Sequence, residues 1–351
     1  MFIRRGTGHA PFVPGTLPDA GRAAIRGPVW IQNDIQEATL KKTAFLFPGQ
    51  GSQTVGMGHD FYQEFDFIRE LFDMADEITK RHISRLCFKG PMEDLTQTVN
   101  LQPAVTTLNL ACLAVLEREG IGSNICAGHS LGEFSALCSA GIMSREDTIG
   151  LVDQRGRLMH REAEKNSGAM HAVIGLSIET VQEIVDEVRR EGIVAVANHN
   201  AEKQIVITGA PDSVKKVSAM AAAKGARAIP LKVSGAWHSD LMKGAEKEFM
   251  DALSGTEFIP PGVPVVHNVT ADVAGDPLEI QNIMGRQLCS PVKWYDSMCR
   301  MMAEGVEVFV EVGPGRVLSG LLKKILPKEY PYSVFAVNSL KTFEKFLGAT
   351  R

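Results

Sequence analysis

The chain has 351 residues, of which 44% are apolar, 22% charged and 7% aromatic, and its formal net charge is −4. This composition is typical of a folded globular protein and excludes a disordered charged tail. The length predicts about two domains, or one large domain that carries a smaller one. With no positive field for nucleic acid and no polybasic patch for an anionic membrane, neither partner is expected.

The six cysteines form no C-x-x-C pair and lie mostly in apolar stretches. This distribution is typical of reduced, buried thiols, so it indicates a reducing compartment and favours a cytoplasmic protein. The longest apolar run, residues 104–116, is shorter than the ~20 residues that cross a bilayer. We therefore expect it to be a core helix.

Residues 1–40 are predicted to be a poorly ordered N-terminal extension, because prolines at 11, 14, 18 and 28 interrupt every helix or strand. They also interrupt the apolar core that a secretory signal needs. The Arg-containing, acid-poor start permits an organelle transit peptide, but a plain extension or a start site placed too far upstream is favoured.

From Thr43 onward, short apolar runs alternate with amphipathic segments, which predicts an α/β fold. We expect a strand at 43–47, an apolar helix starting at Gln102-Pro103, a strand at 125–127 and a helix at 131–140. The large domain is predicted to comprise 41–165 and 236–351. In its second part we expect a helix at 239–253, a strand at 263–267, a helix at 294–304 and a strand at 307–312.

The segment between these two parts, residues 166–235, predicts an inserted small subdomain. Its elements follow the order β-α-β-β-α-β, which is the ferredoxin-like unit. We place the strands and helices, in chain order, at 170–176, 178–190, 193–197, 204–208, 212–224 and 227–233.

Gly128-His129-Ser130-Leu131-Gly132 fits the G-x-S-x-G pattern between a predicted strand and a predicted helix. Such a sharp turn exposes the serine hydroxyl at a helix N-terminus. The backbone N–H of Leu131 would then donate to a developing oxyanion. Ser130 is the candidate nucleophile, and the alternative is a purely structural turn.

Arg155 lies on the apolar stripe of a helix that begins near Ser144, where Asp147 completes a capping pattern. A guanidinium that points inward is costly without an anion, and its planar fork suits a carboxylate. Either an internal acidic residue or a substrate carboxylate could be that anion.

His238 precedes a predicted helix and is the candidate general base, because a helix N-terminus disfavours the charged imidazolium. His267 and His199 serve equally well on sequence grounds alone. The histidines lack paired metal-ligand spacing, so no metal is predicted. The loop 49–58 after the first strand fails the glycine pattern of dinucleotide sites and of P-loops, but it can offer a backbone N–H to the serine site.

Several motifs together resemble the malonyl-CoA:acyl-carrier-protein transacylase family, and their order and spacing cover residues 43–326. They are FPGQGSQ at 47–53, GHSLGE at 128–133, QRG at 154–156, HS at 238–239, QL at 287–288 before PV at 291–292, and EVGPG at 311–315.

The resemblance implies an α/β-hydrolase-like large domain with a ferredoxin-like insert. It implies transfer of malonyl from malonyl-CoA to the phosphopantetheine thiol of an acyl carrier protein, through an ester on Ser130. It also assigns roles to other positions: His238 as base, oriented by the main-chain carbonyl of Gln287; Gln50 and Leu131 as backbone oxyanion donors; Arg155 as the carboxylate ligand; Trp237 and His129 as substrate-binding residues.

No resident cofactor is expected, since coenzyme A arrives as a thioester substrate, and a monomer is expected. The resemblance favours a malonyl transferase that feeds fatty-acid synthesis. A stand-alone polyketide acyltransferase has the same chemistry and is not separable from it by sequence. A hydrolase or thioesterase is the alternative from another class, although it has no need of an inward arginine, and a docking module without activity is a third. Because carrier proteins are acidic, Arg316, Lys323 and Lys324 are candidates for a basic docking patch, with an ordinary solvated helix face as the alternative.

Overall fold

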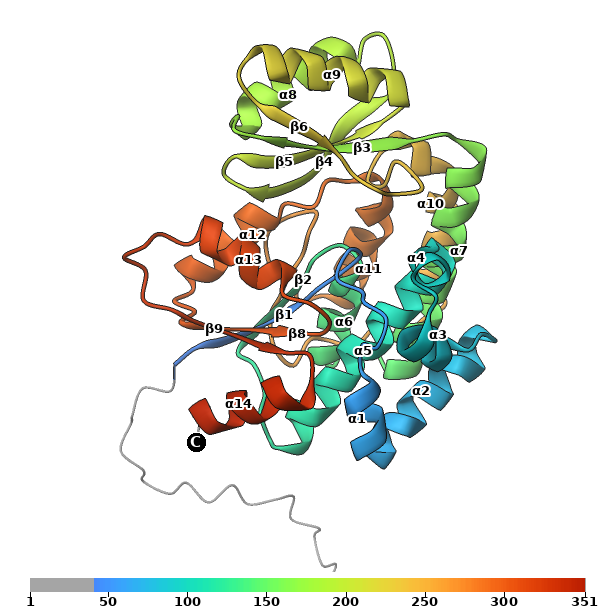
Figure 1. The fold of residues 1–351 in the computed structure, drawn as a ribbon, viewed down its shortest axis with the longest axis vertical. Coiled ribbons are helices and arrows are strands. Elements are labelled where there is room, and N and C mark those ends of the chain that lie inside the picture. The colour runs from blue at the N-terminus through green and yellow to red at the C-terminus, as the bar shows by residue number, and fades with distance from the viewer. Residues whose placement is uncertain (1–40, 351) are drawn as a thin grey trace, which may run out of the picture. The chain divides into compact units, whose positions relative to one another are not determined.

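The computed structural model describes residues 41–350, which form two β-sheets with helices around them (Figure 1). The predicted extension, residues 1–40, lies outside the described residues. The predicted α/β class, with a parallel sheet and a separate smaller one, is confirmed. The larger sheet has the order β7-β2-β1-β8-β9 and consists of β1 (Thr43–Phe47), β2 (Ile125–Gly128), β7 (Val265–Val266), β8 (Val308–Val312) and β9 (Ser333–Val337).

All the neighbouring strands of this sheet run parallel. Both of its faces are buried, as parallel sheets require. In β1, Phe45 and Phe47 join the core on one face, and Ala44 and Leu46 join the core on the other. The near-continuous apolar runs in the sequence reflect this burial on both sides.

Two groups of helices cover these faces (Figure 1). The smaller group, α12 (Trp294–Ala303) and α13 (Val317–Ile325), packs on the face of Ala44 and Leu46. The larger group lies on the opposite side and comprises α1 (His59–Glu64), α2 (Asp66–Thr79), α3 (Ile83–Lys89), α4 (Met92–Thr96), α5 (Thr98–Arg118), α6 (Gly132–Ser139), α7 (Arg145–Lys165), α10 (Lys243–Ser254), α11 (Pro277–Arg286) and α14 (Leu340–Thr350).

Helix α5 begins at Thr98, so the predicted start at Gln102 is wrong and Pro103 lies inside the helix. Proline has no N–H, which leaves the carbonyl of Val99 without its helical donor. The guanidinium of Arg81 replaces that donor, with Nη1 at 2.7 Å from Val99 O. An internal proline is therefore tolerated at this position.

By length and composition alone, α5 is the one helix in the described part of the chain that could span a membrane. The apolar run 104–116 had indicated a segment too short for a membrane span, but the whole helix has 21 residues, so length alone does not exclude one. Its burial identifies it instead, because 89% of its apolar window is covered by the rest of the protein. This pattern is that of a core helix.

The smaller sheet is antiparallel, with the order β4-β5-β3-β6. Its elements are β3 (Ala169–Ile174), α8 (Ile178–Val188), β4 (Val194–Ala201), β5 (Gln204–Gly209), α9 (Pro211–Ala223) and β6 (Arg227–Pro230). Both helices lie on one face of this sheet, at the top of Figure 1, and their apolar side chains form a separate core with it. From the other face, Met170, Ala172 and Val206 join the core of the larger group of helices.

The antiparallel sheet lies within the predicted subdomain, residues 166–235, and the parallel sheet lies outside it. The domain boundaries themselves stay a prediction. The last strand of the antiparallel sheet, β6, ends at Pro230 and not at residue 233 as predicted. Residues 231–233 line a cleft instead. The helix predicted from 239 begins instead with a short 3₁₀ turn, η1 (Asp240–Met242), before α10.

Candidate active site

Ser130 lies in the tight turn between β2 and α6, as the G-x-S-x-G pattern predicts. Its φ of 51° is in the left-handed region, which is strained for a residue with a side chain. The flanking glycines make the turn possible. A Cβ on Gly128 would lie 2.0 Å from the backbone of Gly132, and a Cβ on Gly132 would lie 2.0 Å from Phe47 O.

The backbone of this turn is held by Asn268, which the sequence did not single out. The N–H of Ser130 donates to Asn268 Oδ1 at 2.6 Å, and Asn268 Nδ2 donates to Gly128 O at 2.6 Å. The loop of Gln50 touches the same turn, since a Cβ on Gly49 would lie 3.5 Å from the nitrogen of Leu131. That places the two predicted oxyanion donors, Gln50 and Leu131, beside the serine, and their role stays a prediction.

His238 is the histidine that the structure brings to the serine. Its Nε2 lies 2.8 Å from Ser130 Oγ, and its Nδ1 lies 2.9 Å from Gln287 O and 3.0 Å from Ser290 O. Because two carbonyl oxygens face Nδ1, that nitrogen carries the proton and Nε2 presents a lone pair to the hydroxyl. The alternatives lie elsewhere: His267 bonds to Glu133, and His199 faces Asp296 at 3.7 Å.

The imidazole of His238 is neutral for a reason other than the one predicted from the sequence. Burial, and next the positive charge of Arg155, lower its pKa from an ordinary value of 6.5 to about 3. The sequence attributed the neutral form to the N-terminus of a following α-helix, but the element that follows is the short 3₁₀ turn η1. His238 is therefore available as a base at neutral pH.

Arg155 points inward from α7 and is only 1% exposed. Its partners are neutral oxygens: Nη1 lies 2.9 Å from Gln102 Oε1, Nη2 lies 3.0 Å from Gln287 Oε1, and Nη2 also lies 3.2 Å from Ser130 Oγ. Burial lowers the pKa of Arg155 to about 10, against the opposing effect of the carboxylate of Glu133. The guanidinium thus stays positive at neutral pH, next to the candidate nucleophile.

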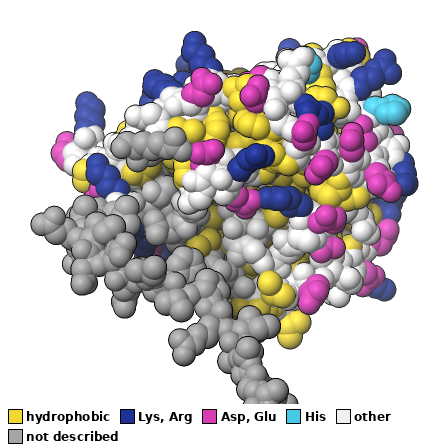
Figure 2. Space-filling model, turned by 90° about the horizontal axis from the view of Figure 1, so that it is seen from below, with side chains coloured by type: hydrophobic (Ala, Val, Ile, Leu, Met, Phe, Trp, Pro, Cys, Tyr) yellow, Lys and Arg dark blue, Asp and Glu magenta, His cyan; other side chains and the backbone are white. Residues whose placement is uncertain are grey.

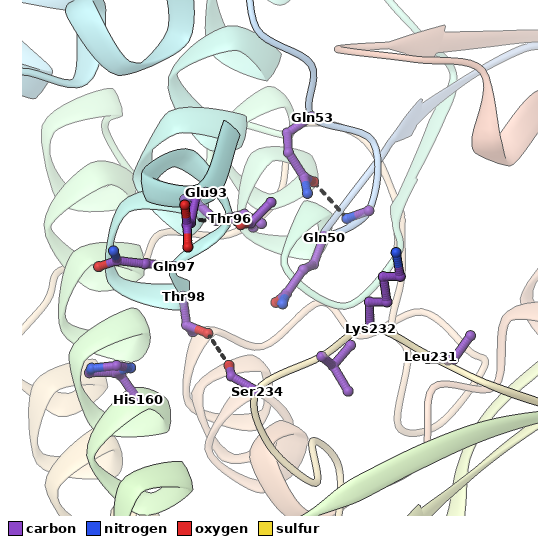
Figure 3. A pocket seen from close by; sticks show the side chains of 13 residues that line it. Gln50, Gln53, Glu93, Thr96, Gln97, Thr98, His160, Leu231, Lys232 and Ser234 are labelled. Carbon is purple, nitrogen blue, oxygen red and sulfur yellow. Dashed lines mark hydrogen bonds between the residues drawn. The ribbon is translucent and has the colours of Figure 1, made fainter. Parts of the chain in front are cut away.

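Ser130 lines a chamber of about 110 Å³, which adjoins a cleft of about 710 Å³. Gln50, Leu231 and Val233 border both spaces. The side chains around the cleft are shown in Figure 3, where Thr98 meets Ser234 across one end. The chamber is lined by Gln50, His129, Ser130, Met159, Met170, Asn198, Leu231, Val233, Trp237 and His238.

Both predicted substrate-binding residues line this chamber. Trp237 is buried, and it packs so closely on Gly235 that a Cβ there would lie 2.7 Å from the indole ring. His129 is held by Asn200, whose Oδ1 lies 2.8 Å from its Nε2, and burial lowers the pKa of His129. Across residues 41–350, no group of three or more His, Cys, Asp or Glu side chains is placed to hold a metal ion.

Comparison with known proteins identifies the family. The profile of a family described as "Acyl transferase domain" matches residues 44–338. The chain is 44% identical over 288 residues to the malonyl CoA-acyl carrier protein transacylase of Bacillus subtilis, covering 82% of this chain and 91% of that one. It is 39% identical over 289 residues to the protein of the same name from Escherichia coli, covering 82% and 94%.

The chain belongs to the malonyl CoA-acyl carrier protein transacylase family. Solved structures of the family superpose on it closely. One is an acyl carrier protein S-malonyltransferase from Vibrio cholerae, with a TM-score of 0.83, 38% identity and coverage of 87% of this chain and 99% of that one. Another, described as a malonyl-transacylase in complex with a type II polyketide acyl carrier protein, has a TM-score of 0.84, 36% identity and coverage of 88% and 99%.

Sequence reasoning assigned no role in this transacylase site to three polar residues, or to the side chain of Gln287. Gln102 bonds Arg155, Asn268 holds the serine turn, and Glu133 accepts from Gln287 Nε2 at 2.6 Å. The sequence carried one usable signal, which is that each of these polar residues interrupts an apolar stretch and must find a partner when buried. Which partner each one finds depends on the tertiary fold.

Proposed function

We propose that this protein transfers the malonyl group of malonyl-CoA to the phosphopantetheine thiol of an acyl carrier protein. The observation that carries the proposal is the 3.2 Å contact between Arg155 Nη2 and Ser130 Oγ. A buried cation with neutral partners, beside a serine paired with a neutral histidine, suits an acyl group that itself bears a carboxylate.

In the first half-reaction, the thioester enters with its carboxylate on Arg155. His238 Nε2 takes the proton of Ser130 as Oγ attacks the thioester carbonyl, and the oxyanion forms next to the N–H groups of Gln50 and Leu131. Nδ1 of His238 stays on Gln287 O, which stabilises the imidazolium. The C–S bond then breaks, the coenzyme A sulfur takes the proton from His238, and malonyl remains as an ester on Ser130.

In the second half-reaction, the carrier thiol approaches through the same cleft. His238 removes its proton, the sulfur attacks the ester carbonyl, and Ser130 Oγ leaves with the proton returned by His238. The cleft supports this proposal, because it adjoins the chamber at the serine and shares Gln50, Leu231 and Val233 with it. Each product departs before the next acceptor enters, which is ping-pong transfer.

The predicted basic docking patch lies on α13 and just before it. Arg316 and Lys323 border a hollow of about 220 Å³ together with Lys345, whereas Lys324 bonds Gln204 Oε1 at 2.9 Å. We keep Arg316, Lys323 and Lys324 as candidates for contact with an acidic carrier. On the face seen in Figure 2, described side chains of both charges lie among apolar ones.

We further propose that the protein serves fatty-acid synthesis in the cytoplasm as a monomer, with no resident cofactor. The six unpaired cysteines support a reducing compartment. A stand-alone polyketide acyltransferase would use the same site.

The function is tested by mixing the protein with malonyl-CoA and measuring its intact mass, with and without holo acyl carrier protein. We expect one malonyl adduct, which disappears as the carrier gains the same mass. Free malonate released at the same rate in both samples would instead show a hydrolase. No adduct at all would favour a docking module.

The pH dependence of adduct formation provides a separate prediction. A histidine whose pKa is lowered to about 3 keeps its lone pair far below pH 6.5, so we expect no loss of acylation rate centred near pH 6.5. Between pH 6.5 and 3 the unfolded chain binds the extra proton and the folded one does not, so this group makes the fold less stable as pH falls. Quenched-flow rates at pH 5 to 8, with circular dichroism as the control, check this; an acid limb with its midpoint near 6.5 would contradict it.

A further inference from the structure

Glu133 is a fully buried carboxylate that the reaction steps above do not use. It lies in the first turn of α6, three residues after the nucleophile, and its side chain is 0% exposed. Three nitrogen atoms lie within hydrogen-bond distance of its two oxygens: His267 Nδ1 at 2.9 Å, and two donors, the backbone N–H of Asn268 at 3.2 Å and Gln287 Nε2 at 2.6 Å. A carboxylate can accept a hydrogen bond from each of these groups.

The side-chain amide of Gln287 connects this carboxylate to Arg155. Its Oε1 accepts from Arg155 Nε at 3.2 Å and Nη2 at 3.0 Å, and its Nε2 donates to Glu133 Oε2. Arginine only donates and a carboxylate only accepts, so this is the single orientation of the amide that satisfies both neighbours. Because Nε2 also reaches Ser130 O at 3.1 Å, the amide is fixed against the serine turn.

We propose that Glu133 is a positioning residue, which acts through Gln287 to balance the charge of Arg155 without touching it. The amide is hydrogen-bonded to the carboxylate on one side and to the guanidinium on the other, and it holds the guanidinium at Ser130. Arg155 therefore has no anion in direct contact. The proposal rests on the proposed function, because it assigns the guanidinium, whose hydrogen-bond partners are all neutral, to the carboxylate of a malonyl group.

The distance between the two charges is what matters for selectivity. A carboxylate in direct contact with Arg155 would form a bidentate ion pair, and the substrate would have to displace it. A buried guanidinium without any counter-charge would be costly and poorly held. One intervening neutral amide avoids both difficulties, since attraction persists across it while the guanidinium donates only to neutral oxygens, which a substrate carboxylate can displace more easily than a bound anion.

The first test is Glu133→Gln, which keeps size and removes charge. An amide at 133 that still accepts from His267 and Asn268 must turn its own NH₂ toward Gln287, so two donors meet. Gln287 then flips and presents a donor to Arg155. We expect kcat/KM for malonyl-CoA to fall about 100-fold, as for misplaced binding groups, with far less change for acetyl-CoA. Glu183→Gln, on the exposed side of α8, is the matched control and should change neither.

The second test is the charge swap Glu133→Gln with Gln287→Glu. It restores a buried negative charge and places it directly on Arg155, while the main-chain carbonyl that holds His238 is retained. We expect a melting temperature above that of Glu133→Gln, acetyl transfer like that of Glu133→Gln, and malonyl selectivity that stays lost.

Three results would overturn the proposal. They are an unchanged malonyl-to-acetyl ratio in Glu133→Gln, recovery of parental selectivity in the swap, and an equal fall for both acyl donors in either variant, which would mean a disturbed serine turn. Failure of the proposed function is distinguishable, because the parent protein itself would then form no malonyl adduct.

Discussion

Replacing Ser130 with alanine is expected to abolish the malonyl adduct and to reduce transfer by about 10⁶-fold, the loss seen when a serine enzyme loses its nucleophile. The remaining parts of the site stay in place, because the backbone N–H at position 130 still bonds Asn268 and the glycines that shape the turn are unchanged. The variant should therefore still bind malonyl-CoA but not react with it.

Intact mass after incubation with malonyl-CoA measures the adduct, and quenched-flow assays measure transfer to holo carrier protein. Ser254→Ala, on the exposed end of α10, is the control and should react like the parent. A stable adduct on the Ser130→Ala protein would identify another nucleophile. The cysteines are poor candidates, since burial raises the pKa of Cys87, Cys112 and Cys126 and so disfavours their reactive thiolates.

The parts of the site that follow from local sequence were predictable. The turn at Ser130 needs glycines at fixed positions, and the inward direction of Arg155 follows from its place on a helical stripe. Ser144 caps that helix as predicted, with its Oγ accepting from the N–H of Asp147 at 3.0 Å. In each case the determining neighbours lie within a few residues along the chain.

The parts that depend on distant contacts were not predictable from residue patterns. His238 reaches the serine across 108 positions, and His267 and His199 were equal candidates until the fold placed them elsewhere. The contact between Glu133 and Gln287 spans 154 positions. The helix start predicted from Pro103 was wrong for the same reason, because Arg81, which replaces the missing donor, lies outside the helix.

Replacing Arg155 with alanine is expected to lower kcat/KM for malonyl-CoA by about 10² to 10³, which matches the loss of one partner from a buried hydrogen-bonded charge pair. Acetyl-CoA has no carboxylate and should lose much less, so the ratio of the two acyl donors is the quantity to measure. Arg157→Ala is the matched control: it lies on the same helix, is half exposed and pairs with Asp153.

The ratio is also the right measurement because Arg155→Ala disturbs the fold. It leaves Gln102 Oε1 and Gln287 Oε1 without their donor and Glu133 without a counter-charge, so the melting temperature should fall and both rates should decrease somewhat. Arg155→Lys separates the two effects. It restores the positive charge but not the planar fork, so stability should recover further than malonyl transfer. Equal losses for malonyl and acetyl donors in both variants would mean that the arginine only supports the structure.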